Sequence, residues 1–139
     1  MAVGTGNGTS LREAALAALE NAYAPYSNFR VGAALRTRGG KVITGCNMEN
    51  AAFGLALCAE TLAVAYAVSQ GITEFEEIAI ATEDTAPTPP CGACRQVLNE
   101  FAPDIRVVSY TRSGGEASWS LSELLPNAFV LNNSRGRNV

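Results

Sequence analysis

The pattern of apolar and polar positions predicts helices and strands that alternate along the chain. Ala- and Leu-rich stretches predict three helices and one short helical turn, at residues 10–23, 58–70, 91–101 and 122–125. Short apolar runs bounded by Gly, Pro and polar residues predict five strands, at residues 31–37, 41–45, 77–81, 105–110 and 117–121. Such alternation favours an α/β fold, and we expect a three-layer α/β/α sandwich around a five-stranded mixed sheet.

Local signals mark the ends of these elements. Ser10 and Glu13 have the spacing of an N-terminal capping box, which predicts where the first helix begins. Pro25 then stops that helix, because proline cannot donate a backbone hydrogen bond. The Arg-Gly-Gly sequence at 38–40 predicts a hairpin between the first two strands.

The length and composition predict one folded domain. The chain has 139 residues, of which 47% are hydrophobic, so it is large enough to bury a core. No repeat divides it. We expect a disordered Gly- and Thr-rich leader, a single domain and a loose polar tail, at residues 1–9, 10–131 and 132–139.

The charge and residue usage exclude several classes of function. The net charge is −3 and the pI is near 4.9, which argues against a nucleic-acid partner. No apolar run is long enough for a membrane partner, and the N-terminus lacks the apolar core of a signal peptide, so a cytoplasmic location is expected. In that compartment the four cysteines are expected to be metal ligands and not disulfides. Histidine is absent, which excludes Ser–His and Cys–His nucleophile pairs.

Three cysteines and one glutamate form the candidate chemical group. Cys91 and Cys94 are three positions apart, so on a helix they share one face and can reach one ion. Cys58, at the start of the preceding helix, would be the third ligand. Three protein ligands leave one position of a tetrahedral zinc site open, as in catalytic zinc sites. Glu60 would line the cavity without binding the metal, and would accept a proton.

Two other interpretations of the cysteines remain open at this point. A redox dithiol formed by Cys91 and Cys94 would leave Cys58 and Glu60 unexplained. A closed structural zinc site with Cys46 as the fourth ligand would explain all four thiols. Glu60, considered alone, is typical of a solvated helix residue.

The ordered motifs of the chain carry a resemblance to a known family. They are AYAPYSNF at 22–29, VGAA at 31–34, TGCNMENA at 44–51, CAE at 58–60, PCGACRQVL at 90–98 and LLPNAF at 124–129. Together they resemble the small homotetrameric zinc-dependent cytidine deaminases of the cytidine/deoxycytidylate deaminase superfamily. The resemblance covers residues 11–129 in order and with similar spacing. It implies hydrolytic deamination of cytidine and deoxycytidine to uridine and deoxyuridine, with release of ammonia, in pyrimidine salvage.

The resemblance also implies a role for each matching residue. One zinc ion per chain would be bound by Cys58, Cys91 and Cys94, with Glu60 as the proton shuttle. Cys46 would not be a ligand.

The substrate contacts implied by the resemblance come from several segments. Asn47 and Glu49 would bind the ribose hydroxyls, and Phe29 would pack on the pyrimidine. The backbone around Ala51 and Ala59 would contact the edge of the base. Phe129 would reach the site of a neighbouring subunit, so that the sites of a homotetramer would be shared between subunits.

The sequence departs from the family pattern at positions near the expected site. Thr61 replaces an arginine whose guanidinium bonds the zinc thiolates, and Phe53 replaces a tyrosine. Arg30 stands where proline is common, and Val130 where glycine is common. The alternative substrate is therefore a modified cytosine nucleoside such as blasticidin S. A structural-zinc interaction module is the alternative outside the enzyme class.

Overall fold

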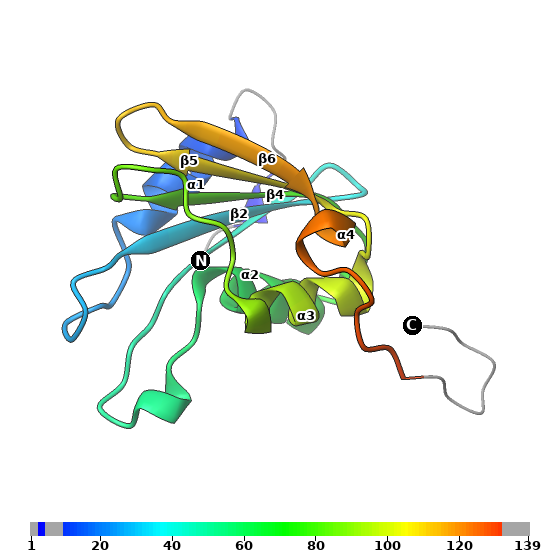
Figure 1. Ribbon diagram of the computed structural model, residues 1–139, viewed down its shortest axis with the longest axis horizontal. Helices are drawn as coiled ribbons and strands as arrows, with labels where there is room; N and C mark the ends of the chain where they lie inside the picture. Colours follow the sequence, from blue (N-terminus) through cyan, green and yellow to red (C-terminus); the bar gives the residue numbers. More distant parts are fainter. Residues whose placement is uncertain (1–2, 5–9, 132–139) are drawn as a thin grey trace.

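A computed structural model of the chain describes residues 3–4 and 10–131. Six strands form one sheet in the order β1-β3-β2-β4-β5-β6 (Figure 1). The strands are β1 (Val3–Gly4), β2 (Val31–Thr37), β3 (Val42–Cys46), β4 (Phe75–Thr82), β5 (Arg106–Thr111) and β6 (Glu116–Ser120). The helices are α1 (Leu11–Leu19), the 3₁₀ helix η1 (Phe53–Leu55), α2 (Ala59–Ser69), α3 (Gly92–Phe101) and α4 (Leu121–Leu124).

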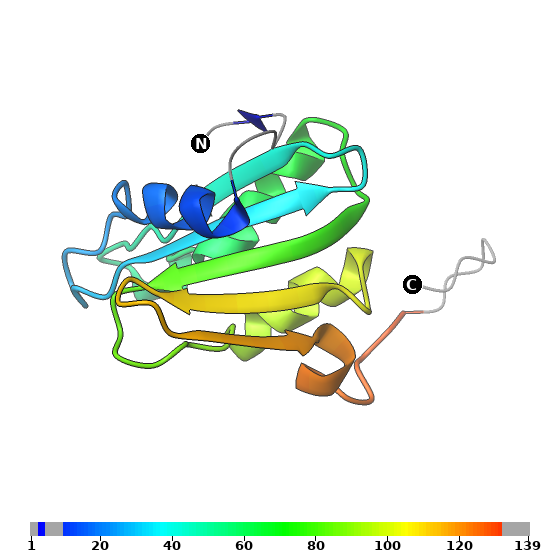
Figure 2. The ribbon, with the colours of Figure 1, turned by 90° about the horizontal axis from the view of Figure 1, so that it is seen from above.

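The layers of the sandwich follow the predicted fold class. Helix α1 covers one face of the sheet, and α2 and α3 cover the other (Figures 1 and 2). Strands β3, β2 and β4 pair antiparallel, β4 and β5 pair parallel, and β5 and β6 pair antiparallel, so the sheet is mixed. The five predicted strands are present, and each begins and ends within two residues of its expected limits. The predicted α/β/α sandwich is confirmed.

The sixth strand is a correction to the sequence analysis. Residues 1–9 were expected to form a disordered leader, but Val3 and Gly4 pair with Ile43 and Val42. Strand β3 would otherwise be an edge strand with free backbone N–H and C=O groups, which a short segment can satisfy without any apolar pattern of its own. Residues 1–2, 5–9 and the tail at 132–139 lie outside the described residues.

The first helix begins where predicted and ends earlier. The Ser10 hydroxyl accepts a hydrogen bond from the Glu13 N–H at 3.1 Å, as expected of its capping box. The helix ends at Leu19, four residues before the predicted limit at residue 23. The reason is a contact distant in sequence: Tyr23 N–H donates to the Asn47 carbonyl at 3.0 Å, which pulls residues 20–23 out of the helix.

Two glycines bring the helices close to the sheet. A Cβ added at Gly32 would lie 2.0 Å from the Ala15 carbonyl oxygen of α1. A Cβ added at Gly45 would lie 2.6 Å from the Ala59 oxygen and 2.7 Å from the Ala63 nitrogen of α2. Because no real Cβ fits at such distances, Gly45 permits the N-terminal turn of α2 to rest directly on β3. This contact fixes the position of Cys58 and Glu60, at the start of α2, relative to the sheet.

The segment between β3 and α2 extends away from the body of the domain (Figure 1). It contains η1, and Phe53 and Leu55 in that helix are 77% and 65% exposed. Among the described residues, no helix has the length and apolar character needed to cross a membrane.

Candidate metal centre and adjoining cavity

Three cysteines meet where two helices begin. Cys58 is the N-cap residue of α2, Cys91 is the N-cap residue of α3, and Cys94 lies in the first turn of α3. Their Sγ atoms all lie within 4.8 Å of one another, and those of Cys58 and Cys91 are 3.7 Å apart. The sequence predicted that Cys58 and Cys91 belong to first turns. Both instead precede the first turn as N-cap residues, and neither side chain makes a capping hydrogen bond.

The spacing and chemistry of this cysteine group fit zinc. Sulfurs bound at about 2.3 Å around a tetrahedral centre lie about 3.8 Å apart, close to the Cys58–Cys91 separation. A hydrogen bond with Cys58 and burial together raise the pKa of the Cys94 thiol, so without a cation this thiol favours its protonated form. A divalent cation removes this penalty, because it stabilises the thiolates that bind it.

Cys46 and Glu60 are not members of the cysteine group. Among the described residues, the set of thiols and carboxylates close enough to share one ion contains Cys58, Cys91 and Cys94. Cys46 is half-buried at the end of β3, and burial raises the pKa of its thiol. This arrangement counts against the closed four-cysteine site, and it agrees with the expectation that Glu60 is not a ligand.

Glu60 is buried, which contradicts its interpretation as an ordinary solvated helix residue. It is the second residue of α2 and is only 5% exposed. Burial raises the pKa of its carboxyl group, and hydrogen bonds from its own backbone N–H and from Cys94 partly oppose this effect. A buried carboxyl group with a raised pKa, next to a metal site, is typical of a residue that accepts and returns protons.

A cavity of about 310 Å³ lies beside the cysteine group. Seven of the predicted site residues line it, namely Phe29, Asn47, Glu49, Cys58, Ala59, Glu60 and Cys91. The predicted contacts Ala51 and Phe129 are exposed and do not line this cavity.

The sequence analysis missed several residues of the cavity wall. They are Val31, Ala56, Leu57, Ile80, Thr82, Thr88 and Pro89. Thr82 carried a detectable signal, since it is a polar residue at the end of an apolar strand and is fully buried. Thr88 and Pro89 lie in a Pro-rich loop whose path cannot be inferred from local pattern.

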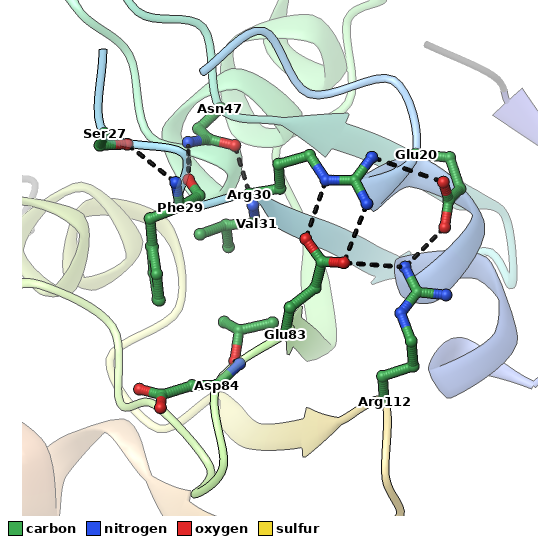
Figure 3. Close-up of polar contacts among 10 residues, drawn as sticks. Glu20, Ser27, Phe29, Arg30, Val31, Asn47, Glu83, Asp84 and Arg112 are labelled. Carbon is green, nitrogen blue, oxygen red and sulfur yellow. Dashed lines mark hydrogen bonds and ion pairs between the residues drawn. The ribbon is translucent and has the colours of Figure 1, made fainter. Parts of the chain in front are cut away.

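The amide of Asn47 holds the entry to strand β2. Its Nδ2 donates to the Phe29 carbonyl at 2.8 Å, and its Oδ1 accepts from the Val31 N–H at 2.9 Å (Figure 3). The side chain therefore fixes the backbone on both sides of residue 30. One amide hydrogen and one lone pair remain for a ligand.

The carboxylate of Glu49 organises the loop that precedes Phe29. It accepts hydrogen bonds from the Tyr26 N–H at 2.9 Å, the Ser27 N–H at 3.1 Å and the Ser27 hydroxyl. The hydrogen bond from the Ser27 hydroxyl is the main cause that lowers the pKa of Glu49, so its charged form is favoured. Asn47 and Glu49 thus shape the cavity wall as well as facing the cavity.

Comparison with known proteins places this geometry in a family. The sequence model of the cytidine and deoxycytidylate deaminase zinc-binding region matches residues 7–111. This chain belongs to that deaminase family.

Individual deaminases are similar over most of their length. A protein of Halalkalibacterium halodurans named cytidine deaminase is 47% identical over 117 residues, which are 84% of this chain and 89% of the relative. The 1.6 Å crystal structure of cytidine deaminase from Burkholderia pseudomallei superimposes with a TM-score of 0.83 at 52% identity. That match covers 86% of this chain and 96% of the crystallised one. A blasticidin-S deaminase of Bacillus cereus is 30% identical over 110 residues, 73% of this chain and 78% of that protein.

The cofactor of this deaminase domain is zinc. The three cysteine sulfurs lie close enough together to bind one such ion. Thr61, which stands where the resemblance implies an arginine, directs its hydroxyl to the Cys94 sulfur at 3.3 Å. Arg95 does not replace that arginine at the sulfurs. Its guanidinium donates to the Pro90 carbonyl at 2.8 Å and to the Leu124 carbonyl at 2.7 Å, and so ties α3 to α4.

The C-terminal part of the deaminase domain presents an apolar surface. Phe129, Val130 and Leu131 are 70%, 45% and 65% exposed. Gln96 on α3 donates from Nε2 to the Phe129 carbonyl at 3.0 Å, which holds the backbone of this segment on the domain. Its side chains are thereby left facing outward.

Proposed function

We propose that this protein catalyses the hydrolytic deamination of cytidine and deoxycytidine to uridine and deoxyuridine, with release of ammonia. The observation that carries the proposal is the buried carboxyl group of Glu60 between the cysteine group and a cavity lined by Phe29, Asn47 and Glu49. Relatives named cytidine deaminase at 40–47% identity support it. A role in pyrimidine salvage in the cytoplasm would follow from this chemistry.

In this proposal Cys58, Cys91 and Cys94 hold one zinc ion per chain. When bound, zinc supplies a Lewis acid that makes water a stronger acid and a better nucleophile near neutral pH. The positive ends of the two helix dipoles would stabilise the negative charge of the bound sulfurs. The role of the cysteines is therefore to hold the ion beside the cavity and beside Glu60.

Glu60 moves the protons of the reaction. Its carboxylate takes one proton from the attacking water and delivers it to ring nitrogen N3, while the water oxygen bonds to C4. It then takes the second proton, from the new C4 hydroxyl group, and delivers it to the amino group. The C4–N bond breaks, ammonia leaves and a C4 carbonyl remains. One buried carboxyl group serves as base and as acid, and its raised pKa suits both roles.

The remaining cavity residues orient the substrate. Asn47 and Glu49 keep hydrogen-bonding capacity toward the cavity and would bind the ribose hydroxyls. Phe29 lines the same cavity and would pack on the pyrimidine ring. The backbone of Ala59 lies in the wall and would contact the base edge, and we assign the same role to the backbone around Ala51.

The site would be completed by other subunits of a homotetramer. Large apolar side chains are exposed on the loops that precede β2 and α2 and along the C-terminal segment, namely Tyr26, Phe53, Leu55, Leu57, Phe129, Val130 and Leu131. An exposed apolar surface of this extent is typical of a protein interface. We therefore assign Phe129 to the site of a neighbouring subunit.

A modified cytosine nucleoside such as blasticidin S is the second candidate substrate. Two observations favour it: the similarity to a blasticidin-S deaminase, and the hydroxyl of Thr61 at the Cys94 sulfur in place of a guanidinium. A structural-zinc interaction module has less support, because three cysteines beside a cavity with a buried glutamate leave an open position.

Ultraviolet spectroscopy with purified, zinc-loaded protein tests these alternatives together. Cytidine, deoxycytidine and blasticidin S are supplied in parallel, and loss of the cytosine chromophore is followed. The proposal predicts turnover of cytidine and deoxycytidine. Turnover of blasticidin S alone would assign the second substrate class. If none of the three is turned over, the structural-zinc interaction module would be the interpretation that remains.

A further inference from the structure

Four charged side chains form a closed ring at one end of the sheet. The Arg30 guanidinium makes a bidentate pair with Glu83, with Nε–Oε1 and Nη2–Oε2 distances of 2.8 and 2.9 Å (Figure 3). Arg30 also lies 3.5 Å from Glu20, and Arg112 lies 2.5 Å from Glu20 and 3.8 Å from Glu83. The ring joins the C-cap of α1 to residues next to β2, β4 and β5.

The Arg30–Glu83 pair extends the contact between two strands that line the cavity. In the antiparallel register of β2 and β4, the last backbone pair is Val31 with Thr82, so Arg30 and Glu83 occupy the next opposed positions. The backbone pairing of the strands ends at Val31 and Thr82. A salt bridge between side chains therefore continues the connection one residue further.

Each member of the pair is the immediate neighbour of a cavity residue. Phe29 precedes Arg30, Thr82 precedes Glu83, and both Phe29 and Thr82 line the cavity. In Figure 3 the side chains of Phe29 and Arg30 point to different sides of the backbone. This is the alternation expected of an extended chain. Neither Arg30 nor Glu83 lines the cavity, so the pair lies next to the cavity wall and is not part of it.

Phe29 depends on this support because little else encloses it. The residue is 39% exposed. Its backbone is held by the Asn47 amide and by a 3.0 Å hydrogen bond from its N–H to the Ser27 hydroxyl. These hydrogen bonds connect Phe29 to Ser27 and Asn47. The Arg30–Glu83 pair instead connects the residue after Phe29 to the end of β4.

We propose that Arg30 is a positioning residue, whose ion pair with Glu83 holds Phe29 at a fixed distance from the Thr82 wall of the substrate cavity. The proposal rests on the proposed function, in which Phe29 packs on the pyrimidine. A ring contact of this kind is made by the bound substrate and by the transition state alike. Loss of the pair should therefore raise KM and leave kcat nearly unchanged.

A double-mutant cycle on cytidine turnover tests the proposal. Arg30→Gln and Glu83→Gln should each raise KM about fivefold, since an exposed ion pair makes a modest contribution. The double variant should show less than the sum of the two single increases, because all three proteins lack the Arg30–Glu83 pair, while each single variant also loses a longer contact of its own, to Glu20 or to Arg112. Arg30→Lys keeps the charge but loses the bidentate geometry, so its KM should lie between those of the unaltered protein and Arg30→Gln.

The same strand offers a matched control. Arg38 lies 3.5 Å from Glu74, beyond the other end of β2 and away from the cavity. Arg38→Gln also removes an arginine from an exposed pair, and it should leave KM unchanged. Melting temperatures of all variants are measured in parallel, with kinetics recorded well below the lowest of them.

The possible outcomes separate this proposal from the proposed function. An unchanged KM in Arg30→Gln, or additive KM increases in the double variant, would overturn the positioning role alone. A lower melting temperature without a KM effect would show a merely structural pair and would also overturn it. Failure of the unaltered, zinc-loaded protein to turn over cytidine would overturn the proposed function, and the positioning role with it.

Discussion

The two halves of the cavity are built in different ways. On the cysteine side, Cys58, Cys91, Cys94 and Glu60 stand at the N-termini of two helices, and Cys94 and Glu60 are buried within one chain. On the loop side, the wall comes from the segments around Phe29 and Glu49, which are held by hydrogen bonds in exposed positions. The proposed chemistry thus belongs to the rigid half, and the proposed substrate binding to the open half.

This difference teaches which half one chain can complete. Helix N-termini are fixed by packing of α2 and α3 against the sheet and against each other, so three thiols converge without help from a partner. The loop half leaves Tyr26 and Phe53 at 52% and 77% exposure, and Phe129 of the C-terminal segment, which does not line the cavity, is 70% exposed. A metal site formed by one chain and a binding site completed by neighbours is the arrangement that the proposed homotetramer requires.

Removing a ligand from the cysteine side should have the largest effect. Cys91→Ala should lose zinc and all measurable turnover, because two remaining thiols bind the ion far more weakly. Cys46→Ala is the matched control, since Cys46 lies outside the cysteine group, and it should retain about one zinc per chain. Zinc content is measured by atomic emission after gel filtration. Equal loss of zinc in both variants would instead favour the closed four-cysteine site.

On the loop side, loss of a contact from another subunit should affect binding and spare the metal. Phe129→Ala should raise KM for cytidine about tenfold, since truncating an aromatic side chain at an interface costs about 1–2 kcal/mol. Zinc content should stay unchanged. Val130→Ala, one residue further along the same exposed segment, is the control. A monomer of the unaltered protein that sediments alone with full activity would contradict the shared site.

A subtler change on the cysteine side concerns the hydroxyl at position 61. Thr61→Val keeps the shape but removes the hydrogen bond to Cys94, and should weaken zinc binding about tenfold, because hydrogen bonds to charged groups are worth about 1.5 kcal/mol or more. Thr61→Ser retains the hydroxyl and should bind zinc normally. Competition with a chromophoric chelator gives both affinities. Equal affinities for the Val and Ser variants would exclude this role of the hydroxyl.

The smallest predicted effect is a shift in the titration of Glu49. Its pKa lies below the ordinary value, so the carboxylate keeps its charge to a lower pH than an ordinary glutamate does. Ser27→Ala removes the largest cause of this shift, and the pKa should rise toward 4.5. The two remaining backbone donors, of Tyr26 and Ser27, should keep part of the shift. Carbon-detected NMR titration of the glutamate carboxyl groups checks this, and an unchanged pKa would mean that the backbone donors dominate.

Much of the cysteine side could be predicted from local sequence. The Ala- and Leu-rich run after Cys58 and the proline before Cys91 mark helix starts, and the spacing of Cys91 and Cys94 places both thiols on one face. The burial of Glu60 could not be predicted this way, because it depends on the close approach of α2 to Gly45 on β3. The local sequence pattern therefore identified the site residues, but it did not predict how deeply each side chain is buried.

The loop side was less predictable because its contacts are distant in sequence. The early end of α1 follows from pairing of Tyr23 with the segment around Asn47, and the loop before Phe29 is held by Glu49. The short strand β1 forms because β3 offers a free edge, and its own two residues carry no strand pattern. Each of these features is determined by a partner 20 or more residues away, which periodicity does not detect.

The most direct test of the account is the turnover of Glu60→Gln at full zinc occupancy. The amide has nearly the shape of the carboxyl group but cannot carry a proton, so the fold and one zinc per chain should be retained. Turnover of cytidine should fall by about a thousandfold or more, within the range that general acid–base catalysis contributes. A zinc-replete Glu60→Gln protein that turns over cytidine at a near-normal rate would contradict the assignment of Glu60 as the proton carrier.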